Sequence, residues 1–369
     1  CLRPPKGAIF LAKPVPCRWF LGCNSQNGFY SLFEQFTRPQ AGWRCILIKG
    51  GPGTGKSTVM KRVARLAQRR GQPVEEIFCS SDAASLDGVI LPKTKTVLLD
   101  ATPPHALEPQ FPGAVEQPFS LCGCWNEDIL RARREEIVTL GEEIGGLHLQ
   151  AVRFLSGAGA LLGEARRLAA ETLLREKLSQ YARRLADREL PRSGTPGREE
   201  LRLLSAVTDR GQVMFHETIP ALCSRVYCIE DPHGAVAAQL LSLLREEAAG
   251  RGCAVIACPC PLSPEKLDHL LLPEAGVAFV TRNGLHPLPP GGKIIRAERF
   301  TDKAALKVRR VRLRFLQKTA DTLLRQAGLC MAAAHRQHDR LESIYIGATD
   351  FAAVDRLADG LLQKLAEDM

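Results

Sequence analysis

A glycine-rich turn followed by a lysine and a serine lies in the segment CILIKGGPGTGKSTVMKR, residues 45–62. The four apolar residues before the turn predict a short buried strand, and the residues after it predict a helix that runs to Arg70. The turn matches GxxxxGK[ST], in which glycines let backbone N–H groups face the phosphates of a nucleotide, the lysine binds the β- and γ-phosphates and the hydroxyl binds Mg²⁺. We therefore predict a Mg-ATP site whose nucleotide-binding residues are Gly50, Gly51, Pro52, Gly53, Thr54, Gly55, Lys56, Ser57 and Thr58.

An acidic partner for the magnesium ion lies in TKTVLLDATPPH, residues 94–105, where an aspartate follows three apolar residues. A buried strand that ends in an acidic residue supplies this partner in P-loop nucleoside triphosphatases. We predict that Ser57 and Asp100 organise the metal, and that Lys56 and Asp100 are catalytic. No glutamate follows Asp100, which favours the kinase and GTPase side of P-loop proteins over motor-type ATPases.

Asp82 is the remaining catalytic candidate, because it closes a second predicted strand in IFCSSD, residues 77–82. A carboxylate at the carboxyl end of that strand can orient water or accept a substrate proton beside the γ-phosphate. The alternative is structural: Asp82 would be the N-cap of a helix formed by SLDGVI.

The chain contains an internal repeat with an offset of 181 residues. Residues 45–107 align with residues 226–288 without a gap, and 13 of the 63 columns are identical. Average residue usage gives about four identities by chance. FLGCNSQNGFYSLF also resembles LLSAVTDRGQVMF, and ILRARREEI resembles ALKVRRVRL. We infer a duplication and predict an α/β fold of two tandem P-loop-like three-layer α/β/α modules, each with an appended helical hairpin.

The second copy lacks the residues that would act on a nucleotide. Its segment VYCIEDPHGAVAAQLL keeps the strand, the turn and the helix, but the lysine, the hydroxyl and the acidic residue are all replaced: the pairs are Lys56/Ala237, Ser57/Ala238 and Asp100/Thr281. Asp231 places a negative charge where phosphates would lie, and Pro232 removes a backbone donor. We predict that the second copy does not bind a triphosphate in the usual way.

The second copy also acts as an internal control for residues that only resemble a catalytic group. A histidine, an aspartate and a cysteine are kept in both copies, as His105/His286, Asp87/Asp268 and Cys79/Cys260. Because they persist where no phosphate is expected, we interpret them as structural.

Helical segments follow each predicted sheet. A three-four spacing of apolar residues from Ile137 to Leu168 predicts a long amphipathic helix, which we expect to be half of a hairpin on the first module. PRSGTPG, residues 191–197, is the predicted linker. The first module then covers residues 17–190 and the second covers residues 198–369.

Positive charge is concentrated near the C-terminus. The formal net charge is +10 with a pI of about 9.1, and the segment 293–340 holds 13 Lys/Arg against 4 Asp/Glu. A helix from Thr301 onward presents one basic stripe opposite an apolar stripe; the basic residues are Lys307, Arg310, Arg314, Lys318 and Arg325. A solvated face is the commoner meaning, and binding of a nucleic-acid backbone is the alternative. Few aromatic residues interleave with these charges for stacking on bases.

The remaining composition is typical of a soluble protein. Of the 369 residues, 45% are hydrophobic and 24% are charged. No run approaches the 18 or more apolar residues of a membrane span, so we expect a cytoplasmic protein without a membrane partner. The 13 cysteines are spread without zinc-like spacing, which favours reduced thiols over a disulfide framework or a metal site.

Taken together, these motifs give the chain a family resemblance. From FLGCNSQNGFYSLF through KGGPGTGKST, CSSDAASLDGVILP and LLDATPPHALEP to the final helices, it resembles a little-characterised bacterial family of tandem P-loop proteins, labelled ATPase or nucleotide kinase. The resemblance covers nearly the whole chain and implies ATP binding without naming a substrate. The second module of that family can carry its own glycine-rich loop. EDPHGAVAA departs from this, so two cooperating nucleotide sites are not implied here.

Three hypotheses of function follow. The leading one is a Mg-ATP-binding P-loop ATPase, a hydrolase with one working and one vestigial nucleotide site. The second is a kinase that transfers the γ-phosphate to a small molecule or nucleotide. The third is a nucleotide-dependent module that binds nucleic acid, through Lys307, Arg310, Arg314 and Lys318, or a protein.

Overall fold

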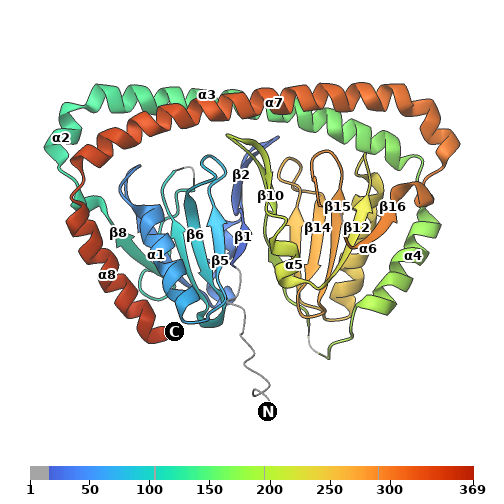
Figure 1. Cartoon of the computed structure of the whole chain (residues 1–369), viewed down its shortest axis with the longest axis horizontal. Coiled ribbons are helices and arrows are strands. Elements are labelled where there is room, and N and C mark those ends of the chain that lie inside the picture. Colours follow the sequence, from blue (N-terminus) through green and yellow to red (C-terminus); the bar gives the residue numbers. More distant parts are fainter. Residues whose placement is uncertain (1–15, 104, 195, 290) are drawn as a thin grey trace, which may run out of the picture.

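The computed structural model describes residues 16–103, 105–194, 196–289 and 291–369. Two six-stranded mixed sheets stand below a pair of long helices that run side by side across the whole molecule (Figure 1). The mixed α/β class predicted from the sequence is confirmed.

The first sheet has the order β1-β5-β6-β7-β4-β8, in which β6 is antiparallel to both of its neighbours. Its strands are β1 Cys17–Trp19, β5 Glu75–Phe78, β6 Leu86–Leu91, β7 Thr96–Asp100, β4 Arg44–Lys49 and β8 Glu116–Ser120. The segment SLDGVI is therefore part of a strand, and the prediction of a helix there was wrong. Its β-branched and apolar residues lie in the sheet interior, where burial decides the conformation.

The second sheet repeats the first, with the order β9-β13-β14-β15-β12-β16. Its strands are β9 Glu199–Leu201, β13 Val255–Pro259, β14 Leu267–Leu272, β15 Val277–Arg282, β12 Arg225–Glu230 and β16 Lys293–Arg296. A hairpin precedes the strand that leads into the loop and helix in each half, β4 or β12: β2 Gly22–Ser25 with β3 Gly28–Ser31, and β10 Ser205–Thr208 with β11 Gly211–Met214. The shared strand order supports the duplication inferred from the sequence.

Most of the helices have a counterpart in the other copy. The α-helices are α1 Lys56–Arg69, α2 Glu127–Ala132, α3 Arg134–Ala170, α4 Arg175–Glu189, α5 Thr218–Leu222, α6 Ala235–Gly250, α7 Lys303–Ala348 and α8 Phe351–Asp368. Of these, α1 corresponds to α6, α4 to α8, and α2 with α3 to α7. Short 3₁₀ helices cover η1 Phe33–Gln35, η2 Pro39–Ala41, η3 Pro92–Thr94, η4 Cys122–Cys124 and η5 Ala297–Phe300. No helix among the described residues combines the length and the apolar character needed to cross a bilayer.

The two sheets share one hydrophobic core, and this corrects the expectation of three-layer α/β/α modules. Alternate residues of β4 face opposite ways: Cys45 and Leu47 join a cluster that continues into the second sheet through Leu271 and Val280. Ile46 and Ile48, on the other face, pack against α1 and α8. Each sheet therefore has helices on one face and the other module on the opposite face, in the order α-β-β-α. The apolar inner faces need a cover, and each copy provides it for the other.

The long helices exchange partners between the modules, so the predicted appended hairpins are not formed. α3 and α7 lie against each other, with the start of each beside the end of the other. Beyond them, α4 turns down onto the second sheet, where Leu178 and Leu185 pack in the core around α6. α8 does the same on the first sheet, where Val354 and Leu361 pack in the core around α1. An amphipathic helix can bury its apolar stripe against either module, and the length of α3 and α7 directs it to the distant one (Figure 1).

Candidate functional site

The predicted phosphate-binding turn connects β4 to α1. Gly53 and Gly55 take left-handed conformations, with φ of 67° and 93° respectively. Both values favour glycine, because a Cβ atom is strained in this region. The buried Thr54 hydroxyl donates to the Gly51 carbonyl at 2.8 Å and fixes the shape of the turn. The first turn of α1 leaves backbone N–H groups without intrahelical acceptors and aims them toward this loop.

Lys56 folds back over the turn. Its ammonium group donates to the carbonyl oxygens of Gly50 at 3.0 Å and Gly51 at 2.8 Å, and it lies 3.6 Å from a carboxylate oxygen of Asp100. β7 is the immediate parallel neighbour of β4, and Asp100 lies beside Ile48 in the register. The structure therefore brings Lys56 and Asp100 together, as the sequence predicted.

Asp100 and Ser57 are both engaged by neighbouring groups. Burial raises the pKa of Asp100, and the nearby ammonium of Lys56 opposes this shift. One carboxylate oxygen of Asp100 accepts from the backbone N–H and the hydroxyl of Thr102, at 2.9 and 2.6 Å. The Ser57 hydroxyl oxygen accepts from the Leu86 N–H at 3.0 Å, which ties the start of β6 to the start of α1.

Asp82 belongs to the turn between β5 and β6. One of its carboxylate oxygens accepts from the Ala84 N–H at 2.9 Å, and its carbonyl accepts from the Ser85 N–H at 3.0 Å. The same turn ends at Leu86, which contacts Ser57. Within the described ranges, Asp82 forms no hydrogen bond or ion pair with Lys56, Ser57 or Asp100.

A group that the sequence did not reveal lies on the turn: the C-terminal part of α7. A carboxylate oxygen of Glu342 accepts from the Gly53 N–H at 3.2 Å. A Cβ atom on Gly53 would lie 2.9 Å from the Glu342 carbonyl oxygen, and one on Gly51 would lie 2.6 Å from the ring of Tyr345. The helix thus approaches the loop so closely that a methyl group has no room, and it places a carboxylate on a donor that a phosphate would use.

One signal could have pointed to Glu342. The helices repeat with an offset of 176 residues, as the capping residues Asn126 of α2 and Asp302 of α7 show. Both also donate their backbone N–H to a carbonyl oxygen at or just after the end of the opposite long helix, Asn126 to Ala348 and Asp302 to Thr172. At this offset the residue that corresponds to Glu342 is Arg166, so the two copies carry opposite charges here. The sequence alone does not show that α7 crosses to the first module, so this reversal of charge could not be connected with the first turn.

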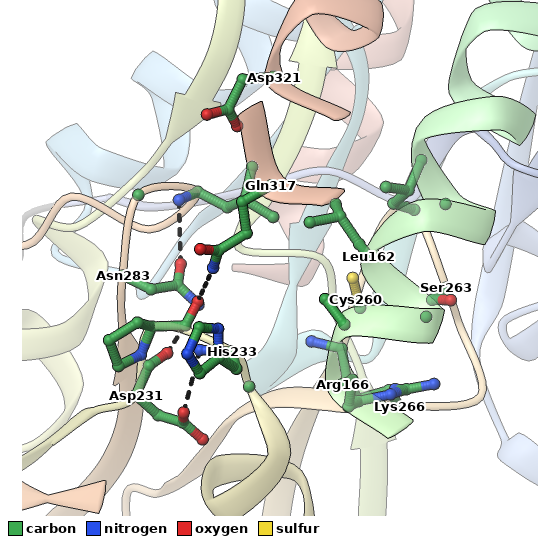
Figure 2. Close-up of a pocket in the computed structure, with 18 of the residues that line it drawn as sticks. Leu162, Arg166, Asp231, His233, Cys260, Ser263, Lys266, Asn283, Gln317 and Asp321 are labelled. Atoms are coloured by element: carbon green, nitrogen blue, oxygen red, sulfur yellow. Dashed lines mark hydrogen bonds between the residues drawn. The ribbon is translucent and has the colours of Figure 1, made fainter. Parts of the chain in front are cut away.

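The turn of the second copy has a different backbone. Only four residues separate the end of β12 from the start of α6 at Ala235, whereas six residues separate β4 from α1. The carboxylate of Asp231 accepts from the N–H groups of His233 at 3.1 Å and Ala237 at 2.9 Å. The side chain of Gln317 descends from α7 and donates to the Pro232 carbonyl at 2.7 Å (Figure 2). The loop's own carboxylate therefore takes the donors that a phosphate would need.

The pairs kept in both copies have the same geometry in both. His105 Nε2 lies 3.1 Å from Asp87, and His286 Nε2 lies 3.2 Å from Asp268. Burial alone would lower the pKa of His105, but the Asp87 carboxylate outweighs it and raises that pKa. His105 also stacks on the ring of Phe33. Their presence in both modules agrees with the structural interpretation.

The basic stripe of α7 faces solvent, as expected. Its exposed residues are Lys307, Arg310, Arg314, Lys318 and Arg325. On the opposite side, Leu313, Leu316 and Ala320 are buried. Nucleic-acid binding through this stripe stays a prediction.

Among the described residues, no group of three or more His, Cys, Asp or Glu side chains could hold a metal ion by itself. A comparison of the chain with protein-family models, with curated proteins and with solved structures found no match. The resemblance to tandem P-loop proteins and the binding of ATP therefore stay predictions, and the local geometry is what supports them.

Proposed function

We propose that this protein binds Mg-ATP in the turn before α1 and hydrolyses it, and that the second copy is a vestigial P-loop module. The observation that carries the proposal is the contrast between the two turns. The first has left-handed glycines, Lys56 and an adjacent Asp100, whereas the second has its donors taken by Asp231. A glycine turn that leads into a helix N-terminus, with an ammonium group beside it, suits a polyphosphate.

Each residue of the first turn and its surroundings would have a separate role in binding or hydrolysis. The backbone of residues 50–57 would surround the phosphates, and the Lys56 ammonium would leave the Gly50 and Gly51 carbonyls to reach the β- and γ-phosphates. Ser57 and Asp100 would hold a magnesium ion, since their oxygens are hard donors, Ser57 follows Lys56 in the chain and Asp100 lies 3.6 Å from the Lys56 ammonium. The ion would neutralise charge on the bound phosphates. Asp82, through its second carboxylate oxygen, would orient the attacking water.

Nucleotide binding would also act on α7. A triphosphate in this turn competes with Glu342 for the Gly53 N–H, and it adds negative charge beside that carboxylate. α7 continues to Gln317, which contacts the second loop, 25 residues away and thus about 37 Å along the helix axis. We infer that ATP binding displaces the end of α7 and that hydrolysis lets it return, which would change the relation between the two modules.

Hydrolysis is preferred over phosphoryl transfer because of where the cavities lie. The cavities of about 390 and 640 Å³ are both lined by Asp231 and Gln317 of the second module. A cavity of about 450 Å³ in the first module is lined by Arg44 and Thr96, which begin β4 and β7 and so lie at the opposite end of these strands from Lys56. An acceptor molecule bound there would be far outside the reach of a γ-phosphate beside Lys56, since transfer needs near contact.

The test is ATP binding by calorimetry and phosphate release by the purified protein. We expect one ATP per chain, and we expect Lys56→Ala to lower turnover by at least about a hundredfold. The control is Lys318→Ala, which removes an exposed lysine on α7. Unchanged binding and turnover in Lys56→Ala would refute the assignment of the site.

A further inference from the structure

The second module has a cavity of its own beside the loop that lost its phosphate-binding residues. It has a volume of about 640 Å³ and lies at the carboxyl ends of β12 and β16, next to Asp231 and Arg296. A second cavity of about 390 Å³, shown in Figure 2, shares Asp231 and His233 of the same loop, and Gln317 of α7 lines both cavities. The carboxyl ends of strands are where open α/β sheets bind ligands, and the larger volume is that of a small-molecule site.

Three cations of α7 line the larger cavity without a counter-charge. Lys307, Arg310 and Arg314 follow one another at helical spacing, and within the described ranges none of them forms an ion pair or hydrogen bond through its side chain. The other basic residues of the wall are neutralised: Arg296 lies 3.8 Å from Glu230, and Lys303 lies 3.2 Å from Glu298.

The acidic groups of the wall do not offset the trio Lys307, Arg310 and Arg314. Glu230 is 3.5 Å from Arg282 in addition to its contact with Arg296. The Asp231 carboxylate accepts from its own loop. The α7 side of the cavity is therefore left with an excess of positive charge.

The first module provides a comparison for this trio. At the offset of 176 residues, the counterparts are Arg131, Arg134 and Val138. Arg131 is held at 3.0 Å by both Glu127 and Asp128, and Val138 carries no charge. The unpaired trio is thus specific to the copy whose turn cannot hold a phosphate.

We propose that this cavity binds a phosphorylated small molecule. The trio is spread over seven helical steps, about 10 Å along the axis, which matches a diphosphate or two separate phosphate groups. Arginine forks match phosphate oxygens in pairs, and lysine adds a point charge. Leu173 and Leu306, which are half-buried, supply an apolar surface for the organic part of the ligand. The proposal does not depend on ATP binding by the first module.

A compact ligand fits these residues better than a nucleic-acid backbone does. A polymer would follow the exposed stripe beyond the cavity to Lys318 and Arg325, neither of which lines it. The trio is instead gathered at one concave site with an apolar wall. Binding of a nucleic acid in place of the small molecule is therefore an outcome that the experiment can return.

The experiment is calorimetric titration of the full-length Lys56→Ala protein with inorganic pyrophosphate at low salt, so that the first turn does not contribute. We expect one pyrophosphate per chain. The double variant Arg310→Gln, Arg314→Gln in the same background should bind it about tenfold more weakly or worse, because charge-assisted hydrogen bonds to the phosphates are lost. Both arginines are exposed, and melting curves check that the variants remain folded.

The matched control is Lys318→Gln, Arg336→Gln, which removes two charges from the same helix outside the cavity. The absence of pyrophosphate binding, or an equal loss in the control, would overturn the proposal. Binding of a short single-stranded RNA that depends on Arg310 and Arg314, in a protein that does not bind pyrophosphate, would replace it with the nucleic-acid hypothesis. A negative result in this titration says nothing about ATP binding, which is tested on the protein that retains Lys56. The two proposals can therefore fail separately.

Discussion

Replacing Glu342 by glutamine tests whether α7 competes with a nucleotide for the first turn. The variant keeps the size of the side chain and an oxygen that can accept from the Gly53 N–H, but it removes the charge. A hydrogen bond to a charged group contributes about 1.5–3 kcal/mol, roughly twice a neutral one. The Glu342 side chain is 38% exposed, so solvent screening reduces the difference to about 1 kcal/mol.

A loss of about 1 kcal/mol from the competing contact should tighten ATP binding about fivefold. The assay is calorimetric titration with ATP and Mg²⁺ at constant ionic strength, for the unmodified protein and for Glu342→Gln. Glu367→Gln is the control, because Glu367 is an exposed carboxylate on α8. Equal affinities for the two variants would refute the competition. A loss of turnover in Glu342→Gln without any gain in affinity would instead assign Glu342 a role in the reaction.

Three other predictions concern the turn and its surroundings. Gly53→Ala should lower the free energy of unfolding by about 2 kcal/mol more than Gly113→Ala, since both glycines have positive φ but only Gly53 is in close contact with α7. Urea denaturation without nucleotide measures both free energies, and equal losses in the two variants would contradict the close approach of α7. Asp82→Asn should lower ATP turnover about a hundredfold with unchanged ATP affinity, and unchanged turnover would leave Asp82 as a turn residue only. His105→Gln should cost more stability at about pH 6 than at about pH 9. The pKa of His105 is raised in the folded protein, so the protonated form stabilises the fold fully below the pKa of the unfolded chain, near 6.5, and this contribution is lost as pH rises through the folded pKa. A difference in denaturation midpoint that does not change with pH would contradict the pairing with Asp87.

Local signals were sufficient for the elements that carry the first turn. Apolar residues 45–48, the glycines that follow and the helix-forming residues after Lys56 specify a strand, a turn and a helix within a short segment, because each depends on near neighbours. Asp100 was found for the same reason, as the end of a buried strand. The duplication was equally visible, and it distinguished the shared pair His105 and Asp87, which has the same geometry in both copies, from Lys56.

Secondary structure near the turn shows where local reasoning fails. SLDGVI has a cap-like residue before it, which suggested a helix, but it forms β6 between β5 and β7. In the second copy, the gapless alignment conceals a helix that begins earlier, at Ala235. Asp231 makes this possible by accepting from Ala237, a contact that neither composition nor spacing predicts.

The sequence by itself determined which copy carries a lysine, a hydroxyl and an acidic residue at phosphate-binding spacing, and which copy lost them. Only the tertiary structure decided that α3 and α7 cross to the opposite module, that the two sheets share a core, and that Glu342 reaches Gly53 across 289 positions of sequence. An amphipathic stripe predicts that one face of a helix is buried, but it does not identify the element that covers that face. The partner therefore depends on the packing of the whole chain. The cavity beside Lys307, Arg310 and Arg314 arises from the same choice, since α7 forms one of its walls.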